Sequence, residues 1–275
     1  MQINNVQLDQ SPYLNLNQSL NRISTGKEIN DASDNASSLA ISDSLRTQSS
    51  GITQSISNVN SAVAASQIAD KSINEQSNIL DNVKEKLLQA STDTTSQEGR
   101  EQLLSEVKDL LENFDDIASS TKYNEQTLLQ NSTDDKAVSQ TQQYQTGTSS
   151  EDIVETQPIQ SNTQGVELES LLNQNPSSFD ASTARAYLGD VDNALTKLNS
   201  FRAEIGSTQN QLESSGKNLF SQFVSTQDAN SAISDLDYSK EVANFSKQNI
   251  LAQIGAYGAA QSSNINQSTV TRLLT

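Results

Sequence analysis

The sequence contains no cysteine, no histidine and no tryptophan. Without cysteine the chain can form no disulfide, no thiolate metal site and no thiol nucleophile. Without histidine it lacks the most common general base and metal ligand, and a His-Glu-x-x-His metalloprotease motif is excluded. The composition therefore predicts a chain that is not an enzyme, with no catalytic residue, no metal site and no cofactor.

Basic and apolar residues are also scarce. The 17 basic residues face 34 acidic ones, which gives a net charge of −17 and disfavours nucleic acid and anionic membranes as partners. Hydrophobic residues make up 33% of the chain and aromatic residues 4%, less than a compact globule of this length normally carries. We therefore expect thin apolar seams between long helices. Disorder is the alternative, because Ser, Gln and Asn are abundant.

Long apolar runs are missing as well. No stretch approaches the roughly 20 apolar residues that cross a bilayer. Residues 1–10 have neither a basic start nor an apolar run, so we expect no cleaved secretion signal.

Helical periodicity dominates both ends of the chain. Leu16, Leu20 and Ile23 form a first stripe, which Gly26 interrupts, and residues 27–38 read as a turn or irregular piece. A long helix is predicted over about 44–90. Its sevenfold apolar series, broken once by Ser66, comprises Ile52, Val59, Ile73, Leu80 and Leu87.

Three further helices are predicted. An amphipathic helix around residues 103–117 should fold back antiparallel on the long helix. A third long helix, about 182–229, has an apolar heptad seam whose partner position carries Arg202, Gln209 and Gly216. Residues 230–275 form a last amphipathic segment. Paired carboxylates such as Asp115 and Asp116 read as solvated charges.

Residues 121–182 lose the helical period. Apolar residues are scattered among Gln, Thr, Ser and Gly, and Pro158 and Pro176 supply turns. Short strands or a hairpin are one interpretation, and a solvated linker is the other.

The fold class that follows is mainly α: an elongated antiparallel bundle or coiled coil of long helices, with a small β-containing central insert and paired termini. The expected divisions are a terminal helix and loop (1–44), two halves of a helical rod (45–130 and 183–234), a variable, surface-exposed β or loop insert (131–182), and a C-terminal helix (235–275).

Two blocks go beyond periodicity. Ser-Leu-Asn-Arg-Ile-Ser-Thr-Gly-Lys-Glu-Ile-Asn fills residues 19–30 and continues through Asp34 and Asn35 to Ser42. Asp-Leu-Asp-Tyr-Ser-Lys-Glu-Val-Ala-Asn-Phe-Ser-Lys-Gln-Asn-Ile-Leu fills residues 235–251, and Val-Thr-Arg-Leu-Leu follows at 270–274. These blocks closely resemble the two terminal signatures of bacterial flagellins, over roughly 1–130 and 183–275. The chain resembles the short polar flagellins of the Campylobacter and Helicobacter group.

The resemblance implies a structural subunit that self-assembles into the flagellar filament, the propeller for swimming, outside the cell. It implies type III export, a flagellar export chaperone at the C-terminal helix, and hook-associated and cap proteins as further partners. A hook–filament junction protein is the alternative within the same superfamily. Inner-tube contacts between subunits are expected from Leu16, Leu20, Ile23, Ile250, Leu251, Ile254, Leu273 and Leu274. The rod core is expected from Ile52, Ile56, Val59, Leu195, Leu198, Ile205 and Leu212.

The chain departs from the family pattern in places. The segment before Arg22 is shorter than usual by roughly two helical turns. The region aligned with the innate immune receptor surface carries Asn82 where Arg is usual and Lys86 where Leu is usual, so with Gln89 this surface predicts weak recognition. Candidate O-glycosylation sites in the Ser/Thr-rich middle are Ser132, Thr133, Thr146, Thr148, Ser149 and Ser150.

Overall fold

The computed structural model describes residues 11–274, except for the side chains of Pro12, Asn266, Thr269, Val270, Leu273 and Leu274. The chain divides into two compact units. We call residues 1–50 with 223–275 the terminal unit, and residues 51–222 the rod unit. Two long helices, α2 (Ala32–Ala90) and α5 (Ala181–Ser234), contribute to both units.

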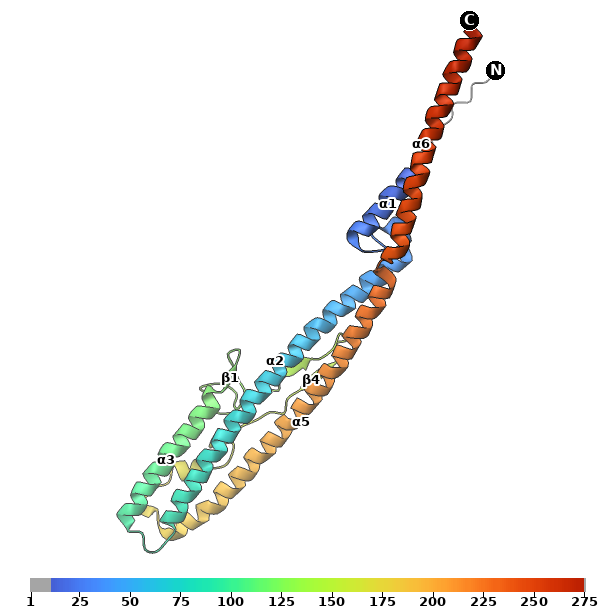
Figure 1. Cartoon of the computed structure of the whole chain (residues 1–275). Coiled ribbons are helices and arrows are strands. Elements are labelled where there is room, and N and C mark those ends of the chain that lie inside the picture. The colour runs from blue at the N-terminus through green and yellow to red at the C-terminus, as the bar shows by residue number, and fades with distance from the viewer. Residues whose placement is uncertain (1–10, 275) are drawn as a thin grey trace. The chain divides into compact units, whose positions relative to one another are not determined.

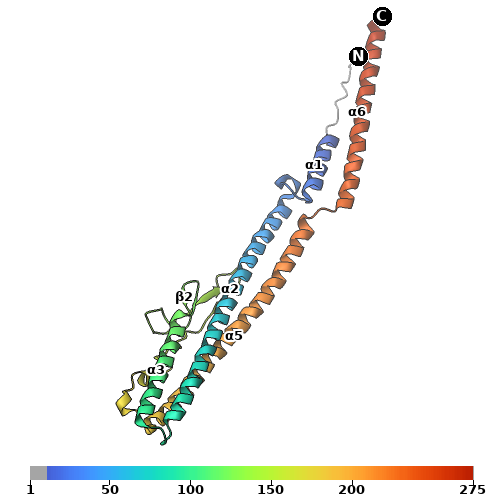
Figure 2. The ribbon, with the colours of Figure 1, turned by 60° about the vertical axis from the view of Figure 1, so that its left-hand side comes forward.

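Three helices run side by side in the rod unit: α2, α3 (Gln97–Ser120) and α5 (Figure 2). Ion pairs join Asp70 to Arg202 and Lys84 to Asp192, so α2 and α5 are antiparallel. The Lys86–Glu106 ion pair and the hydrogen bond from the Gln76 amide to the Phe114 carbonyl oxygen show in the same way that α3 is antiparallel to α2. This arrangement confirms the predicted antiparallel bundle.

Apolar residues every seven positions explain why these helices pack. Ser66 is buried with the rest of its series, so a single polar residue interrupts a continuous buried seam. The buried series on α2 is Ile52, Val59, Ser66, Ile73, Leu80 and Leu87, and the series on α5 is Val191, Leu198, Ile205, Leu212 and Leu219.

The connection between α2 and α3 is held by caps. The Ser96 hydroxyl accepts a hydrogen bond from the main-chain N–H of Gly99 at 3.1 Å, which satisfies one free donor at the start of α3. The Arg100 guanidinium donates to the carbonyl oxygens of Ala90 at 3.1 Å and Thr92 at 3.2 Å. The last turn of α2 is thereby tied to the first turn of α3.

Two small hairpins occupy the region where the sequence loses its helical period. The strands β1 (Lys122–Tyr123) and β2 (Gln126–Thr127) pair antiparallel, and β3 (Gln143–Gln145) pairs with β4 (Ile153–Glu155). A short helix, α4 (Glu169–Leu172), and a 3-10 turn, η1 (Pro176–Ser178), follow. The hairpin interpretation of this region is confirmed.

The solvated-linker interpretation is wrong for the second half of this region. Its apolar side chains belong to the same buried cluster as those of α2, α3 and α5. Val166, Leu168, Leu171 and Phe179 are all at most 2% exposed. The rod unit is therefore thicker than three helices alone, because the chain between α3 and α5 covers one side of its core.

A buried polar network fastens this covering segment to the helices. Asp115 on α3 accepts hydrogen bonds from the main-chain N–H of Thr163 at 2.6 Å and from its hydroxyl at 2.8 Å. Lys136 pairs with the same carboxylate at 2.5 Å. The expectation that Asp115 is a solvated charge is wrong, because this residue is only 9% exposed and has three donors around it.

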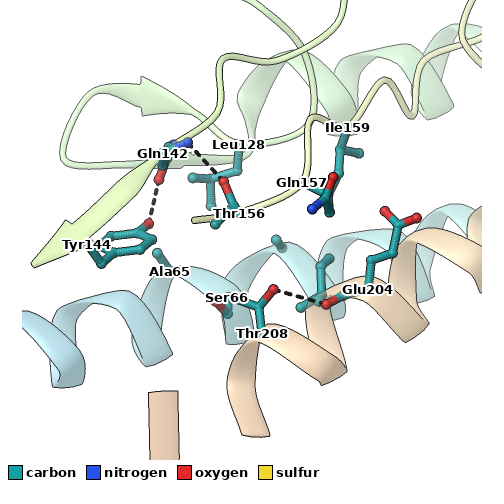
Figure 3. Close-up of a pocket in the computed structure, with 12 residues that line it drawn as sticks. Ala65, Ser66, Leu128, Gln142, Tyr144, Thr156, Gln157, Ile159, Glu204 and Thr208 are labelled. Atoms are coloured by element: carbon teal, nitrogen blue, oxygen red, sulfur yellow. Dashed lines mark hydrogen bonds between the residues drawn. The ribbon is translucent and has the colours of Figure 1, made fainter. Parts of the chain in front are cut away.

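A cavity of about 40 Å³ lies between α2, α5 and the β3–β4 hairpin. Figure 3 shows Ser66 and Thr208 on the helices and Gln142, Tyr144 and Thr156 on the hairpin side. The Ser66 hydroxyl donates to the carbonyl oxygen of Ala62 at 2.9 Å, so it turns back onto its own helix. The small side chain that interrupts the heptad therefore leaves this space unfilled.

Ser66→Val should raise the free energy of unfolding of the rod unit by about 1 kcal/mol, because the added methyl groups enter the cavity. Thermal unfolding followed by circular dichroism measures the change. Ser57→Val, at an exposed position of the same helix, should stay within about 0.5 kcal/mol of the parent chain. A destabilised Ser66→Val chain would mean that the larger side chain does not fit the cavity.

The terminal unit consists of α1 (Ser11–Thr25), α6 (Tyr238–Leu274) and the adjoining ends of α2 and α5. Pro12 occupies the first turn of α1, where a missing N–H costs little. The irregular segment ends earlier than predicted. Helix α2 starts at Ala32 and is kinked at Asn35, whose φ of −163° and ψ of 98° are not helical. Helix α5 also continues past the predicted end, to Ser234.

Candidate assembly surface

Helices α1 and α6 lie against each other in the terminal unit (Figure 1). The Tyr13 hydroxyl donates to the carbonyl oxygen of Ala252 at 3.4 Å, and the Tyr238 hydroxyl donates to that of Ile23 at 3.0 Å. These two bonds set the helices antiparallel. The paired termini predicted from the sequence are confirmed, and two tyrosines that the periodicity did not single out fix their register.

Residues 26–28 and 234–236, which we call the terminal clamp, join the end of α1 to the α5–α6 connection. The main-chain N–H of Glu28 donates to the carbonyl oxygen of Ser234 at 2.8 Å, and that of Leu236 donates to Gly26 at 3.1 Å. Gly26 has a φ of +70°, and a Cβ there would lie 3.3 Å from the Tyr238 hydroxyl oxygen. Glycine is required at this helix end for its conformation and for the close approach of Tyr238.

Asp34 holds the loop between α1 and α2. Its carboxylate accepts hydrogen bonds from the main-chain N–H groups of Asn30 at 3.0 Å and Asp31 at 3.2 Å, and from the Gln18 amide. Arg22 adds an ion pair at 3.3 Å. The hydrogen bond from Asn30, together with those from Gln18 and Asp31 and the Arg22 charge, lowers the pKa of Asp34 to about 2. The Asp34 carboxylate is thus committed to the loop, which leaves no role for it in a cation site.

This lowered pKa predicts an acid-sensitive terminal unit. Asp34 stabilises the folded state fully above its ordinary pKa of 3.8, and the contribution, about 2 kcal/mol, is lost as the pH falls toward 2. Asp34→Asn should therefore lower stability at pH 5 and flatten the decline between about pH 4 and about pH 2. Thermal unfolding of the monomer at stepped pH measures both effects. Asp31→Asn, at an exposed neighbour, should keep the parent's pH profile, and a parent-like profile for Asp34→Asn would contradict the assignment.

The terminal unit exposes its apolar side chains instead of burying them. Of the 31 buried apolar residues among those the structure describes, only Ile29 and Ala252 belong to this unit. Of the 17 large apolar side chains described as exposed, 12 belong to it: Tyr13, Leu14, Leu20, Ile41, Val224, Tyr238, Val242, Ile250, Leu251, Ile254, Tyr257 and Ile265. Such a concentration makes the terminal unit a candidate interaction surface.

The predicted seam residues fall into three groups. Leu20, Ile250, Leu251 and Ile254 are exposed, with Ile254 at 61%. Leu16 and Ile23 are half-buried in the helix pair. Leu273 and Leu274 carry side chains that lie outside the described residues. The Tyr13 hydroxyl, near the start of α1, bonds to Ala252, and Ile23, near the end of α1, bonds to Tyr238. Ile254 therefore lies at the opposite end of the helix pair from Ile23.

The predicted rod-core residues lie on the facing sides of α2 and α5. Ile52, Val59, Leu198, Ile205 and Leu212 are at most 7% exposed, whereas Ile56 and Leu195 are half-buried. On the outer side of α2, Asn82 and Gln89 are exposed, and Lys86 is held by its ion pair with Glu106 at 2.5 Å.

The candidate glycosylation residues are exposed with one exception. Ser132, Thr133, Thr148, Ser149 and Ser150 face solvent. Thr146 is buried, and its hydroxyl lies 3.2 Å from the carbonyl oxygen of Asp152, to which it donates. A buried, bonded hydroxyl is a poor acceptor for a sugar. Over residues 11–274 there is no cluster of three metal-ligating side chains, and no helix has the length and hydropathy of a membrane span.

Comparison with known proteins shows the family of the chain. A model of the bacterial flagellin N-terminal helical region matches residues 1–134, and a model of the bacterial flagellin C-terminal helical region matches residues 188–274. The chain belongs to the bacterial flagellins. It is a structural filament subunit and not an enzyme, and the family places it in the flagellar filament outside the cell.

Two relatives match this flagellin along nearly its whole length, and a third matches less than half of it. It is 30% identical to a flagellar filament core protein of Treponema maltophilum over 92% of its own length and 91% of the relative's. A flagellin of Halalkalibacterium halodurans is 29% identical over 94% and 93% of the two chains. Flagellin A of Helicobacter mustelae is 45% identical, but over 42% of this flagellin and 24% of the relative.

Solved structures share the fold of this flagellin. Bacillus cereus flagellin aligns with a TM-score of 0.52 at 24% identity, over 59% of this chain and 88% of that one. A flagellar hook-associated protein from Vibrio parahaemolyticus aligns with a TM-score of 0.61 at 11% identity, over 74% of this chain and all of that one. At these identities the likeness shows fold alone, so the junction-protein alternative gains no functional support.

Proposed function

We propose that the terminal unit is the surface through which subunits of this flagellin join in the filament. The seam is formed by Leu16, Leu20, Ile23, Ile250, Leu251, Ile254, Leu273 and Leu274. The observation that carries this proposal is that, among the described residues of this unit, 12 large apolar side chains are exposed while the only buried apolar residues are Ile29 and Ala252.

The energetics of the terminal unit support the proposal. The unit buries few of its described apolar side chains, so α1 and α6 gain stability from a neighbour that covers their exposed apolar sides. Each large apolar side chain that becomes buried contributes about 1.5–3 kcal/mol. Head-to-tail contacts whose rotation does not close produce a helical filament without any catalysis.

The distribution of charge also supports contact between terminal units. The terminal unit carries nine acidic and six basic residues, a net charge of −3, so the remaining −14 of the chain's −17 lies in the rod unit. Terminal units can therefore pack closely with little mutual repulsion, whereas the rod unit keeps the assembly soluble. We propose that the rod core of Ile52, Ile56, Val59, Leu195, Leu198, Ile205 and Leu212 holds α2 and α5 together within each rod unit.

Exposed apolar helices also need protection before assembly. We infer that an export chaperone covers α6, that the subunit leaves the cell through the flagellar type III apparatus, and that cap and hook-associated proteins guide its incorporation for swimming motility. The 61% exposure of Ile254 and the 58% exposure of Ile250 in the monomer support a covered state inside the cell.

Seeded polymerisation tests the assembly surface. The full chain should form long filaments on added seeds, and a chain lacking residues 236–275 should not, because half of the helix pair is missing. Circular dichroism must first show that the truncated chain keeps the thermal transition of its rod unit. Retained assembly by a truncated chain with an intact rod unit would refute the terminal seam. A full chain that caps seeds without elongating them would instead indicate a junction protein.

We also propose that this flagellin is a weak ligand of the innate immune flagellin receptor. Asn82 replaces the usual Arg, and Lys86 is engaged by Glu106, so its ammonium group is not free to pair with a receptor. Purified monomer should activate a receptor reporter line at least tenfold less than a flagellin with the usual residues. A variant that combines Asn82→Arg with Lys86→Leu, and keeps Gln89, should show raised activation. Strong activation by the unaltered monomer would refute this proposal.

O-linked sugars are proposed on the exposed hydroxyls of Ser132, Thr133, Thr148, Ser149 and Ser150, with buried Thr146 left out. Intact mass spectrometry of native filament subunits should show added hexose-type masses, and site mapping should find none on Thr146. A subunit mass equal to that of the bare sequence would exclude the modification.

A further inference from the structure

A groove of about 580 Å³ opens on the rod unit beside the hairpins. Three segments form its walls: the β1–β2 turn, residues 131–133, and residues 140–144 leading into β3. Its volume falls in the range of small-molecule and oligosaccharide sites. The filament function leaves this groove without a role.

The chemistry of the groove is neutral, although the rod unit is strongly acidic. Glu125 is the one charged residue along its walls, and the other side chains are amides, hydroxyls and a single aromatic ring. Amides both donate and accept hydrogen bonds, as sugar hydroxyls do. The side chains that the argument uses are those of Gln126, Asn131, Gln140, Thr141, Gln143 and Tyr144.

Hydrogen bonds hold the walls in place. The Thr127 hydroxyl donates to the carbonyl oxygen of Asn131 at 3.0 Å, and the Gln140 amide donates to the Asn131 side-chain oxygen at 2.8 Å. Asn124 and Glu125 hold left-handed backbone conformations, with φ of 48° and 67°, in the two-residue turn at the rim. A fixed polar groove loses little conformational entropy when a ligand binds.

The groove also runs along an open strand edge. The carbonyl oxygen of Gln142 accepts from the N–H of Thr156, and the N–H of Thr146 donates to Asp152, so the even-numbered residues face β4. In an antiparallel pair the residues between them point their main-chain groups the other way. The N–H and C=O groups of Gln143 therefore point away from β4, toward the groove that this residue lines, which adds two hydrogen-bonding groups to the amide side chains.

We propose that this groove binds a neutral oligosaccharide. Sugar hydroxyls match the amides and the open strand edge, and the ring of Tyr144 offers an apolar surface to a pyranose face. Glu125 at the rim and the charge of −14 on the rod unit disfavour acidic sugars. An extended peptide is the poorer fit, because strand addition takes its specificity from pockets for alternate side chains and these walls are uniformly polar.

NMR titration of the recombinant, isotope-labelled full chain tests the proposal. The probes are neutral tetrasaccharides of N-acetylglucosamine and of galactose, an oligogalacturonate of the same length, and a neutral hexapeptide of Gln and Thr. The main-chain N–H signals of Thr141 and Gln143 should move with a neutral sugar at millimolar concentration and stay still with the acidic sugar. Gln126→Ala combined with Thr141→Val should weaken binding at least tenfold, roughly the loss of one or two hydrogen bonds. Gln102→Ala, an exposed amide on α3, should leave binding unchanged.

Four results would overturn the proposal: no movement with any neutral sugar, equal binding of the acidic sugar, binding of the peptide alone, or an unaltered affinity in the double variant whose melting curve matches the parent. Native filament separates two sources of the sugar. Binding to recombinant chain but not to native filament assigns the groove to glycans that the filament itself carries. Binding to both assigns it to an external glycan, and both results support a neutral sugar site.

Discussion

Chains that carry aspartate in place of both Ile250 and Ile254 should remain monomeric under conditions in which the parent chain elongates filaments. These side chains are 58% and 61% exposed, so the monomer tolerates the change. In the proposed seam each substitution removes about 1.5–3 kcal/mol of apolar burial and places a carboxylate where water is excluded. The critical concentration for elongation should therefore rise by more than about 100-fold.

Sedimentation of seeded reactions, with electron microscopy of the pellet, measures this loss. Val138→Asp is the matched control, since Val138 is 47% exposed in the central segment of the rod unit and should elongate normally. Both variants should keep the parent's circular dichroism. Normal filaments from the Ile250→Asp, Ile254→Asp chain would remove α6 from the seam, and failure of the Val138→Asp chain as well would point to a general effect of added charge.

The long helices could be predicted because their signal repeats. Each of α2 and α5 carries five apolar residues in a sevenfold series, so the series predicts a buried seam even where one position is polar. Ser66, which interrupts the series on α2, is buried in spite of its hydroxyl. The resemblance of both terminal blocks to flagellins then gave the family, which the matches over residues 1–134 and 188–274 establish. Because many residues contribute to each of these signals, a single unusual residue does not hide the helix or the family.

The boundaries near the loop were harder to predict. Residues 27–38 look irregular because polar side chains break the apolar period, yet α2 already starts at Ala32. The cause is a set of hydrogen bonds to one carboxylate, Asp34, from the neighbouring main-chain N–H groups of Asn30 and Asp31 and from the Gln18 amide on α1, 16 residues earlier. No local pattern reports such a set of partners, because each partner is an ordinary polar residue by itself.

The central segment was predicted least well, and Asp115 shows why. In the sequence it is one of two adjacent acidic residues, and nothing local distinguishes it from Asp116. In the fold it meets Thr163 and Lys136, which come from 48 and 21 residues further along the chain. Burial of a charge depends on such distant donors, so the periodicity of α3 can place Asp115 at a helix position but cannot supply its environment.

Asp115→Ala should destabilise the rod unit by about 3 kcal/mol, whereas Asp116→Ala should change its stability by less than about 0.5 kcal/mol. Removal of Asp115 leaves the main-chain N–H of Thr163 buried without its acceptor and frees the Lys136 ammonium group. For a unit of this size the melting temperature should fall by roughly 10 °C. The exposed neighbour tests whether the loss of a charge on α3 matters by itself.

Two further measurements distinguish local detachment of the covering segment from a general destabilisation of the helix bundle. If Asp115 fastens the covering segment, tryptic cleavage after Lys136 and Lys122 should accelerate in Asp115→Ala before the helices melt, since the segment detaches locally. Lys136→Met should cost less, about 1 kcal/mol, because that side chain is half exposed and its removal leaves the two Thr163 donors in place. Equal costs for the two variants would mean that the ion pair, and not the donors of Thr163, dominates the network. Unchanged proteolysis in a destabilised Asp115→Ala chain would show instead that the segment and the helices unfold as one unit.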